Sequence, residues 1–203
     1  MNREWQTAED FMNELRADPD YQRRRAEKDR KRRELSALLT EDEKTLVADL
    51  AAVGVQVASV WDLVNTSDRY PAAIPVLLQH LKMDHHRRTR EGITRALITP
   101  DARGVATRQL VRLFQELDDA EVDYKWVLAM AIAETTTKDA IEEVVTLIGE
   151  RRHGWARGPL LDVLKKVDKD HARPLLTSLR NDPDLKKDAN AVLRAIGSTC
   201  RRS

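Results

Sequence analysis

Arginine, lysine and tryptophan are the residue types in this chain that are best suited to hold a partner. Guanidinium and ammonium groups bind carboxylates and phosphates, and arginine and tryptophan supply much of the energy at interfaces. The cations of interest are Arg87, Arg88, Arg90, Lys125, Arg151, Arg152, Arg157, Lys186 and Lys187. Trp126 and Trp155 lie among them. This pattern indicates a surface that binds a partner.

Residues arranged for catalysis or metal binding are scarce. The sequence has no glycine-rich phosphate loop and no serine in a nucleophile-elbow context. His80, His85 and His86 lack the carboxylate or thiolate ligands at fixed spacing that a first-row metal would need. Five carboxylates between Glu116 and Asp123 are interpreted as a solvated turn between helices. We therefore predict no catalytic residue, no metal ligand and no cofactor.

A helical hairpin that recurs four times must position the cations. Apolar stripes at helical spacing predict first helices at residues 73–81, 109–117, 140–148 and 172–179. Their aligned core residues, 36, 31 and 31 positions apart, are Leu77, Leu113, Val144 and Leu175. The second helices are predicted to begin, at steps of 35, 32 and 30 residues, near Arg90, Lys125, Arg157 and Lys187. Two landmarks that recur together indicate stacked hairpins, which bury their apolar faces against one another.

These hairpins resemble the HEAT repeat, in the short form also found in bacterial phycobilisome-lyase-type repeats. The family's first-helix proline appears as Pro75 and Pro174, and its turn aspartate, helix-start arginine and Ala-Leu landmarks appear as Asp84, Arg90 and Ala96-Leu97. The third unit departs from the pattern at Arg151, in place of the turn aspartate, and at Pro159, just inside the second helix. The resemblance implies an all-α fold, a right-handed α-solenoid of about four HEAT-like hairpins whose second helices line the concave face.

The same resemblance divides the cations into two groups. In HEAT repeats the helix-start cation and a turn aspartate commonly pair between adjacent units, which implies structural pairing for Arg90, Lys125 and Arg157. The residues that we predict to contact a partner are Arg87, Arg88, Arg151, Arg152, Trp155, Trp126 and Lys187. Core packing is the alternative for Trp126, which is in helical register with Met130. His86 and His153 occupy equivalent repeat positions and are interpreted as surface histidines.

The N-terminal segment, residues 1–39, is predicted to be a charged helical arm. Thr7 and Asp10 can cap a short helix, and Asp18-Pro19 is typical of the start of a longer one. From Arg23 to Arg33 the longer helix carries eight basic and two acidic residues. Such a run is either a solvated helix or an arm that attracts phosphates or an acidic protein.

Residues 40–68 are predicted to be capping helices for the repeats at residues 69–198. Thr40 to Glu43 reads as a capping box, and Gly54 suits a helix C-terminus that needs a positive φ. The run from Val60 to Asn65 is similar to one that precedes HEAT units in other bacterial proteins. An open end of a repeat stack exposes its core, so a cap of this kind is expected.

Charge and composition favour a cytoplasmic interaction protein. Residues 69–203 carry a net charge of +5 and residues 1–68 a net charge of −4. No apolar stretch reaches the roughly 18 residues needed to span a bilayer, and residues 1–5 lack the apolar region of a secretory signal. We therefore expect no membrane partner. The single cysteine, Cys200, falls in an expected disordered tail at residues 199–203.

The leading functional hypothesis is a non-catalytic scaffold, adaptor or inhibitor that binds a protein on the concave face. The alternative is a nucleic-acid-binding HEAT-like protein that resembles the DNA glycosylases of this fold, with Asp119 and Asp123 near Trp126 as its only candidates for a lesion-facing aspartate. Weak nucleic-acid binding would use the run from Arg23 to Arg33 together with the ridge of cations. A bilin lyase is a third reading, suggested by the repeat resemblance alone.

Overall fold

Every regular element in the described part of the chain is a helix. The computed structural model describes residues 7–198, which form eleven α-helices and four 3-10 helices and contain no strand. The predicted all-α class is confirmed. The chain divides into two compact units, residues 1–42 and residues 43–203. The expected tail at residues 199–203 and the segment at residues 1–5 lie outside the described residues.

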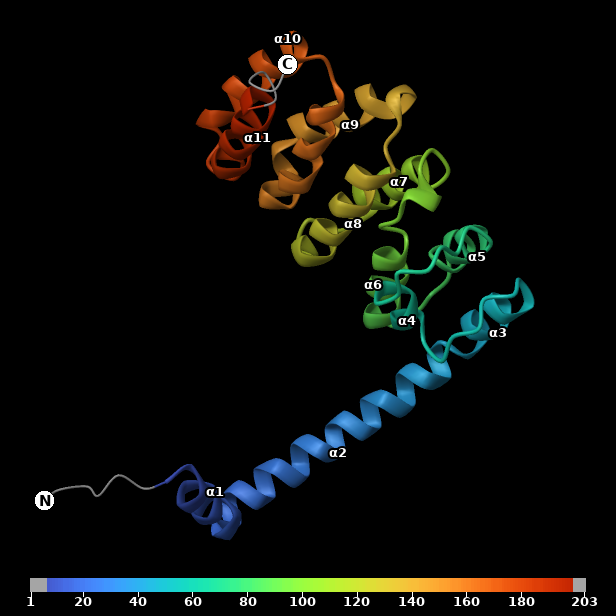
Figure 1. Ribbon diagram of the computed structural model, residues 1–203, viewed down its shortest axis with the longest axis vertical. Helices are drawn as coiled ribbons and strands as arrows, with labels where there is room; N and C mark the ends of the chain where they lie inside the picture. The colour runs from blue at the N-terminus through green and yellow to red at the C-terminus, as the bar shows by residue number, and fades with distance from the viewer. Residues whose placement is uncertain (1–6, 199–203) are drawn as a thin grey trace, which may run out of the picture. The chain divides into compact units, whose positions relative to one another are not determined.

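The first unit contains the two predicted helices of the arm (Figure 1). The α1 helix, Ala8–Ala17, begins at the expected capping box, in which Thr7 and Asp10 each accept from the other's backbone N–H. The α2 helix, Pro19–Asp42, follows directly, and the Asp18 carboxylate accepts from the N–H of Asp20 at 2.8 Å. Neither helix has a buried residue. The first unit is therefore a solvated arm without a core of its own.

The capping box predicted at Thr40 to Glu43 is wrong. The α2 helix continues through Thr40 to Asp42, and the Thr40 hydroxyl donates to the carbonyl of Ser36 at 2.9 Å. Glu43 is almost completely buried and accepts from the N–H of Val60 at 3.0 Å instead. The capping signal failed because the Glu43 carboxylate has a buried partner that lies far away in the sequence.

The predicted capping segment does form two short helices in the second unit. The α3 helix, Lys44–Ala52, ends before Gly54, whose φ of 84° is the left-handed conformation expected there. The α4 helix, Val60–Val64, starts at a capping box between Ser59 and Asp62 that the sequence analysis did not identify. Leu46, Leu50, Val60 and Leu63 bury the apolar faces of these helices.

The first two repeats match the predicted hairpins. The first contains α5, Ala73–His80, and α6, Arg87–Ala96. A 3-10 turn, η1, at Pro100–Ala102 leads to the second repeat, which contains α7, Thr107–Glu116, and α8, Val122–Thr135. Each predicted helix is therefore present, with boundaries shifted by a few residues.

The third and fourth repeats are less regular. After η2, Lys138–Ala140, the third contains α9, Ile141–Gly149, and η3, Arg151–Lys166. Gly154 interrupts η3 with φ 54° and ψ −142°, so its helical part after the kink begins close to the predicted start at Arg157. The fourth repeat contains α10, Lys169–Ser178, η4, Leu179–Asn181, and α11, Lys186–Ser198.

The second helices contact one another in chain order. In each repeat the first helix packs on the second, as α5 on α6, α7 on α8, α9 on η3 and α10 on α11. A second series of contacts runs from α4 to α6, α8, η3 and α11 (Figure 1). One continuous hydrophobic core extends through these helices from Leu46 to Ile196.

The predicted core register is off by one residue in two repeats. Leu77 and Val144 are fully buried, as aligned, whereas Leu113 and Leu175 are only half-buried. Phe114 and Leu176, each one residue later, are fully buried in their place. The error arises because leucine side chains occur on both the core face and its flank, so the position of a leucine alone does not fix the helix rotation.

Candidate interaction surface

Three helix-start cations are engaged in contacts between repeats, as the resemblance implied. Arg90 on α6 lies 3.5 Å from the carboxylate of Glu121, in the turn before α8, and its guanidinium lies 5.3 Å from the ring centre of Tyr124. The partner comes from the following repeat, as expected for these pairs, but it is a glutamate and not a turn aspartate. Arg90 therefore joins the first repeat to the second.

Lys125 is fully buried between the second and third repeats. Its ammonium group donates to the carboxylate of Asp119 and lies 3.1 Å from Nδ1 of His153 and 5.7 Å from the ring centre of Phe114. Burial of an ammonium group is costly unless it is paired. Asp119 supplies the charge, and the Lys125 hydrogen bond is the main reason that the pKa of Asp119 is lowered.

His153 is a core residue, and its interpretation as a surface histidine was wrong. It is 2% exposed, packs edge-on against the Phe114 ring, and places Nε2 at 3.1 Å from the Glu150 carboxylate. Burial, followed by the charges of Lys125 and Arg152, lowers the pKa of His153. The neutral ring fits this site, because Nδ1 then accepts from Lys125 and Nε2 donates to Glu150.

Arg157 forms a buried ion pair between the third and fourth repeats. Its guanidinium lies 3.0 Å from Asp182 and 3.6 Å from Asp184, and it donates to the carbonyls of Ile148 and Gly154, each at 2.9 Å. Burial acts to raise the pKa of Asp182, but the backbone N–H of Asp184 and the Arg157 guanidinium outweigh it, so that the pKa is lowered. The fourth repeat is thus attached through a buried ion pair.

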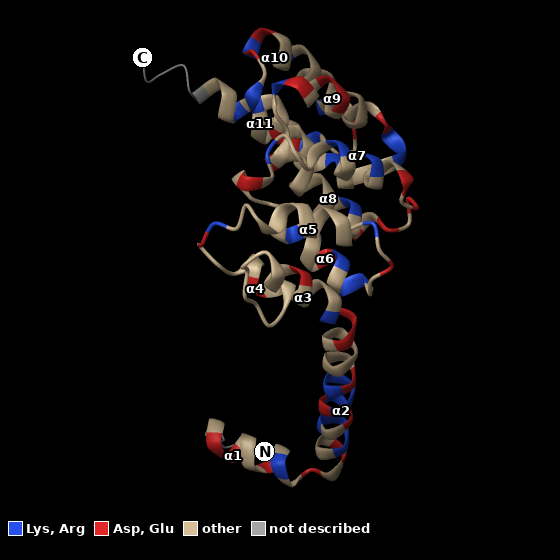
Figure 2. Cartoon of the chain, turned by 90° about the vertical axis from the view of Figure 1, so that its right-hand side faces the viewer, with Lys and Arg blue, Asp and Glu red and all other residues tan. Residues whose placement is uncertain are grey.

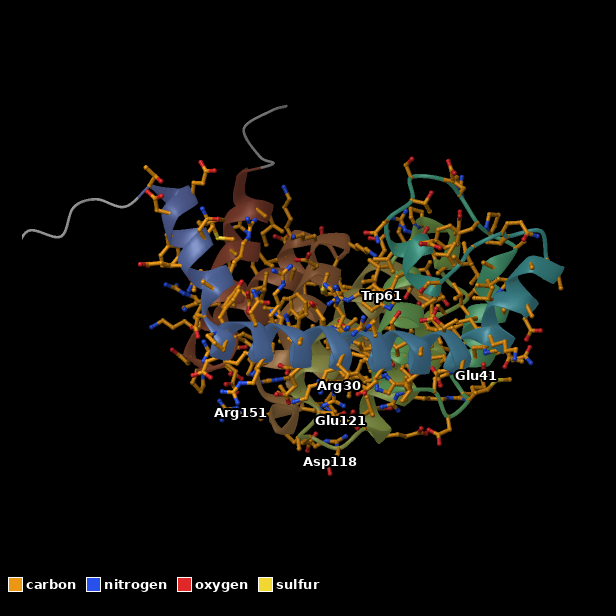
Figure 3. All side chains as sticks on the ribbon, turned by 90° about the horizontal axis from the view of Figure 1, so that it is seen from below. Arg30, Glu41, Trp61, Asp118, Glu121 and Arg151 are labelled. Carbon is orange, nitrogen blue, oxygen red and sulfur yellow. The ribbon has the colours of Figure 1, made fainter. Side chains whose placement is uncertain are left out.

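Acidic side chains lie next to several of the cations found at or just before the starts of the second helices. Arg87 lies 3.9 Å from Asp123, Arg151 lies 3.7 Å from Asp182, and Arg152 lies 3.1 Å from Glu150. Figure 2 shows basic and acidic residues interleaved over the second unit, and Figure 3 places Glu121, Asp118 and Arg151 along one edge of it. The predicted basic ridge is therefore a mixed-charge surface, which favours a partner that itself presents both signs.

Three of the remaining predicted contact residues, Trp155, Arg88 and Lys187, are exposed to solvent. Trp155, just after the Gly154 kink, is 44% exposed next to Arg151 and Arg152. Arg88 and Lys187 are exposed and have no ion pair within residues 7–198. We call Arg151, Arg152 and Trp155 the Trp155 surface. Trp155 is a large exposed aromatic residue that neighbours two arginines in the sequence, and tryptophan and arginine are enriched in interface hot spots.

Trp126 is shared between the core and a surface hollow. It is half-buried against the core, which agrees with the packing alternative, and it also lines a hollow together with Pro159 and Asp188. The Asp188 carboxylate approaches Gly158 so closely that a Cβ there would lie 2.8 Å from Oδ2. Because Trp126 is half-buried, its indole offers only part of its area for contact with a partner.

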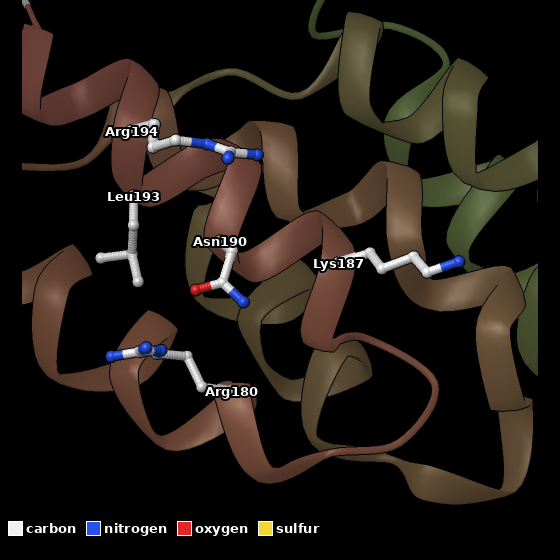
Figure 4. A pocket seen from close by; sticks show the side chains of 5 residues that line it. All are labelled: Arg180, Lys187, Asn190, Leu193 and Arg194. Carbon is white, nitrogen blue, oxygen red and sulfur yellow. The ribbon is translucent and has the colours of Figure 1, made fainter.

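Lys187 borders a different hollow, at the fourth repeat. The hollow is lined by Arg180, Asn190, Leu193 and Arg194 in addition to Lys187 (Figure 4). In the figure the Lys187 side chain extends away from Arg180. Lys187 and Trp126 line different hollows, and neither hollow is lined by Trp155, Arg151 or Arg152.

The histidines of the first repeat form an internal network. His80 is fully buried, with Nδ1 at 3.0 Å from His85 Nε2 and Nε2 at 2.9 Å from the Asp49 carboxylate. His86 caps α6 by accepting from the N–H of Arg88. Within residues 7–198 no cluster of three or more histidine, cysteine, aspartate or glutamate side chains is arranged to hold a metal ion. Sequence analysis missed the His80–Asp49 contact because it joins α3 to α5.

The basic run on α2 is partly neutralised within the helix. Lys31 pairs with Glu27 at 2.7 Å and Arg30 with Glu34 at 3.0 Å, at the helical spacing of four residues. These exposed pairs are typical of a solvated helix. One face of α2 nevertheless gathers four basic residues and a tyrosine, together with Asp29, which lies 3.5 Å from Arg32; the others are Tyr21, Arg24, Arg25 and Lys28.

Comparison with known proteins assigns no family. No protein-family model matches the chain, and neither a curated protein nor a solved structure matches it. Among the described helices, none combines the length and apolar character needed to cross a membrane.

Proposed function

We propose that this chain is a non-catalytic protein-binding scaffold, adaptor or inhibitor, built as a right-handed HEAT-like α-solenoid whose second helices form the concave binding face. The serial contacts from α4 through α6, α8, η3 and α11 support that arrangement, because each second helix packs on the next. A cytoplasmic location is part of the proposal.

The exposure of Trp155 is the observation that carries this function. Arg90, Lys125 and Arg157 already contact residues of neighbouring repeats, and Lys125 also pairs with Asp119 within its own repeat. Trp155, by contrast, leaves a large apolar ring in solvent at 44% exposure. A stability role would bury the ring, since burial of apolar area is what stabilises a core. Its exposure beside two arginines supports a role in contact.

The test is a titration of the partner protein. Tagged full-length chain is used to purify the partner from the source cell, and binding of that purified partner is then measured for wild type and variants. Trp155→Ala should weaken binding about thirtyfold, which corresponds to a hot-spot loss of about 2 kcal/mol. Thermal melts of the same variant should match those of wild type.

A matched substitution provides the control. Arg173 on α10 is exposed like Trp155 but lies outside the predicted contact residues, so Arg173→Ala should leave binding unchanged. If no protein is recovered in stoichiometric amount, or if Trp155→Ala binds as tightly as wild type, the proposal fails. If Trp155→Ala unfolds the chain, the ring has a structural role and the contact surface lies elsewhere.

The basic face of α2 supports nucleic-acid binding as a second candidate function. Arg24, Arg25, Lys28 and Arg32 lie along one face with Tyr21, an arrangement that can follow a phosphate backbone. The DNA glycosylase version has less support, because Asp119 is occupied by Lys125 and His153. Binding to duplex DNA should then fall with salt at a log–log slope of about −0.9 for each phosphate contact. Replacement of Arg24 and Lys28 by glutamine should reduce that slope.

A further inference from the structure

A groove lies on the second unit where the turn between α5 and α6 meets α7. Three of the side chains that line it are apolar and reach solvent: Met83 is 40% exposed, Val105 is 61% exposed and Leu113 is half-buried. Gln109 on α7 donates to the carbonyl of Leu78 on α5 at 2.6 Å, so the two walls are tied together. Exposed apolar side chains gathered at one place are typical of an interaction site.

The rim of the groove is strongly basic. Lys82 lies on one wall, and Arg108 and Arg112 lie one helical turn apart on α7. All three are exposed, and Lys82 and Arg112 have no ion pair within residues 7–198. Glu116 is the only acidic residue that lines the groove. Uncompensated cations beside apolar side chains complement an acidic ligand that also has an apolar side.

Arg90 has one unsatisfied donor. It lines the groove and its Nε is buried without a hydrogen-bond acceptor in the described part of the chain, although its terminal nitrogen pairs with Glu121. Because the Arg90 Nε atom is sealed from solvent, a ligand in the open groove meets only the exposed part of the guanidinium.

We propose that this groove, named here the α7 groove, binds an acidic amphipathic segment of a partner protein. The apolar side chains of the segment cover Met83, Val105 and Leu113, and its carboxylates face Lys82, Arg108 and Arg112. Amphipathic segments commonly dock in this way, with apolar anchors in a groove and charges at its rim. The α7 groove shares no residue with the Trp155 surface. The chain would thus have a second binding site, which selects an acidic amphipathic ligand.

Fluorescence anisotropy of a synthetic peptide tests the proposal on the full-length chain. The labelled peptide carries leucine and phenylalanine at helical spacing and glutamate at its other positions. It should bind the wild-type chain, and the same peptide with glutamine in place of glutamate should bind about tenfold more weakly. A lysine version should not bind. Failure of the glutamate peptide to bind, or equal binding of the lysine version, overturns the proposal.

Substitutions in the groove locate the binding. Arg108→Glu with Arg112→Glu should weaken the glutamate peptide by more than about tenfold. Met83→Gln with Val105→Asn should also weaken it while leaving the charge unchanged. The matched control is Lys169→Glu with Arg173→Glu on α10, where Lys169 is partly exposed and Arg173 is exposed; it makes the same change in net charge and should have little effect. If thermal melts show that the glutamate pair unfolds the chain, Arg108→Gln with Arg112→Gln replaces it.

Two further measurements separate the alternatives. Trp155→Ala should bind the peptide as wild type does, so an equal loss there would place the peptide on the Trp155 surface and overturn the assignment. Duplex DNA that binds more tightly than the peptide and is equally sensitive to Arg108→Glu with Arg112→Glu would assign the groove to nucleic acid. Because no natural partner is used, this test fails or succeeds independently of the Trp155 titration.

Discussion

Arg157 Nη2 lies 3.0 Å from Asp182 Oδ2, and the two side chains are only 1% and 5% exposed. The pair joins η3 to the turn before α11, so the last repeat is attached by a charge contact inside the core. Arg90 with Glu121 joins the first repeat to the second in a corresponding way, whereas Lys125 pairs with Asp119 of its own repeat and contacts His153 of the next. Salt bridges of this kind do not necessarily raise stability, but loss of one partner leaves a charge without compensation.

Arg157→Ala should therefore destabilise the chain strongly. Asp182 would remain buried without its guanidinium, and the carbonyls of Ile148 and Gly154 would lose their donor. The expected loss in free energy of unfolding is about 3–5 kcal/mol, measured by urea denaturation. Arg88→Ala is the control, and as an exposed site it should change stability by less than about 0.5 kcal/mol. Equal stabilities would show that the Arg157 contact has no structural role.

Gly92→Ala should destabilise the junction between α4 and α6. A Cβ at this position would lie 2.6 Å from Cγ1 of Val60 and 3.0 Å from Nε1 of Trp61, and Val60 is fully buried. Overpacking of this kind costs about 1–3 kcal/mol. In Gly149→Ala the new methyl group meets nothing within 4 Å, so that variant should be as stable as wild type or slightly more stable. Thermal melts of both proteins make the comparison.

Phe114→Ala and Leu113→Ala should differ in cost. Phe114 is fully buried and contacts the Lys125 ammonium and the His153 ring, so truncation should cost about 3–5 kcal/mol. Leu113 is half-buried at the edge of the α7 groove and should cost less than about 2 kcal/mol. Chemical denaturation of both variants decides the register of α7. A larger loss for Leu113→Ala would restore the register expected from the sequence.

The comparison of Leu113 with Phe114 also shows what the sequence could predict. Helix periodicity and repeat spacing gave each hairpin, because both are local or regularly recurring signals. The rotation of α7 depends on which flank of the apolar stripe meets α8, and spacing alone does not contain that information. The capping motif at Thr40 failed for a similar reason, since Glu43 binds Val60 in another helix.

Only part of the candidate interaction surface could be predicted from the sequence. The resemblance implied that helix-start cations pair with turn aspartates of adjacent units; Arg157 does so with Asp182, whereas Lys125 pairs with the turn aspartate of its own unit, Asp119. The burial of His153 was not predictable, because the phenylalanine ring and ammonium group that enclose it come from the preceding repeat. The α7 groove was also missed, because Met83 and Val105 belong to two different turns.

Stability should fall on mild acidification because of His153. The pKa of its ring is lowered in the folded chain by burial and by Lys125 and Arg152, whereas the unfolded chain has the usual value of about 6.5. Between the folded pKa and about 6.5 the unfolded chain binds more protons, so stability decreases as pH falls through this window. Asp119 and Glu150 also face the ring, but their attraction to a charged imidazole is outweighed.

The Asp119 carboxylate contributes a second, more acidic window. Its lowered pKa means that its stabilising effect is lost only as pH falls below the usual aspartate range.

Thermal melts of wild type and His153→Gln between neutral pH and mild acid separate the contribution of His153 from that of Asp119. Glutamine can still accept from Lys125 and donate to Glu150 but does not titrate, so His153→Gln should lose less stability than wild type as the pH falls through the histidine window. If His153→Gln and wild type respond to pH in the same way, the folded ring accepts a proton as readily as the unfolded one, and the neutral assignment of His153 is wrong.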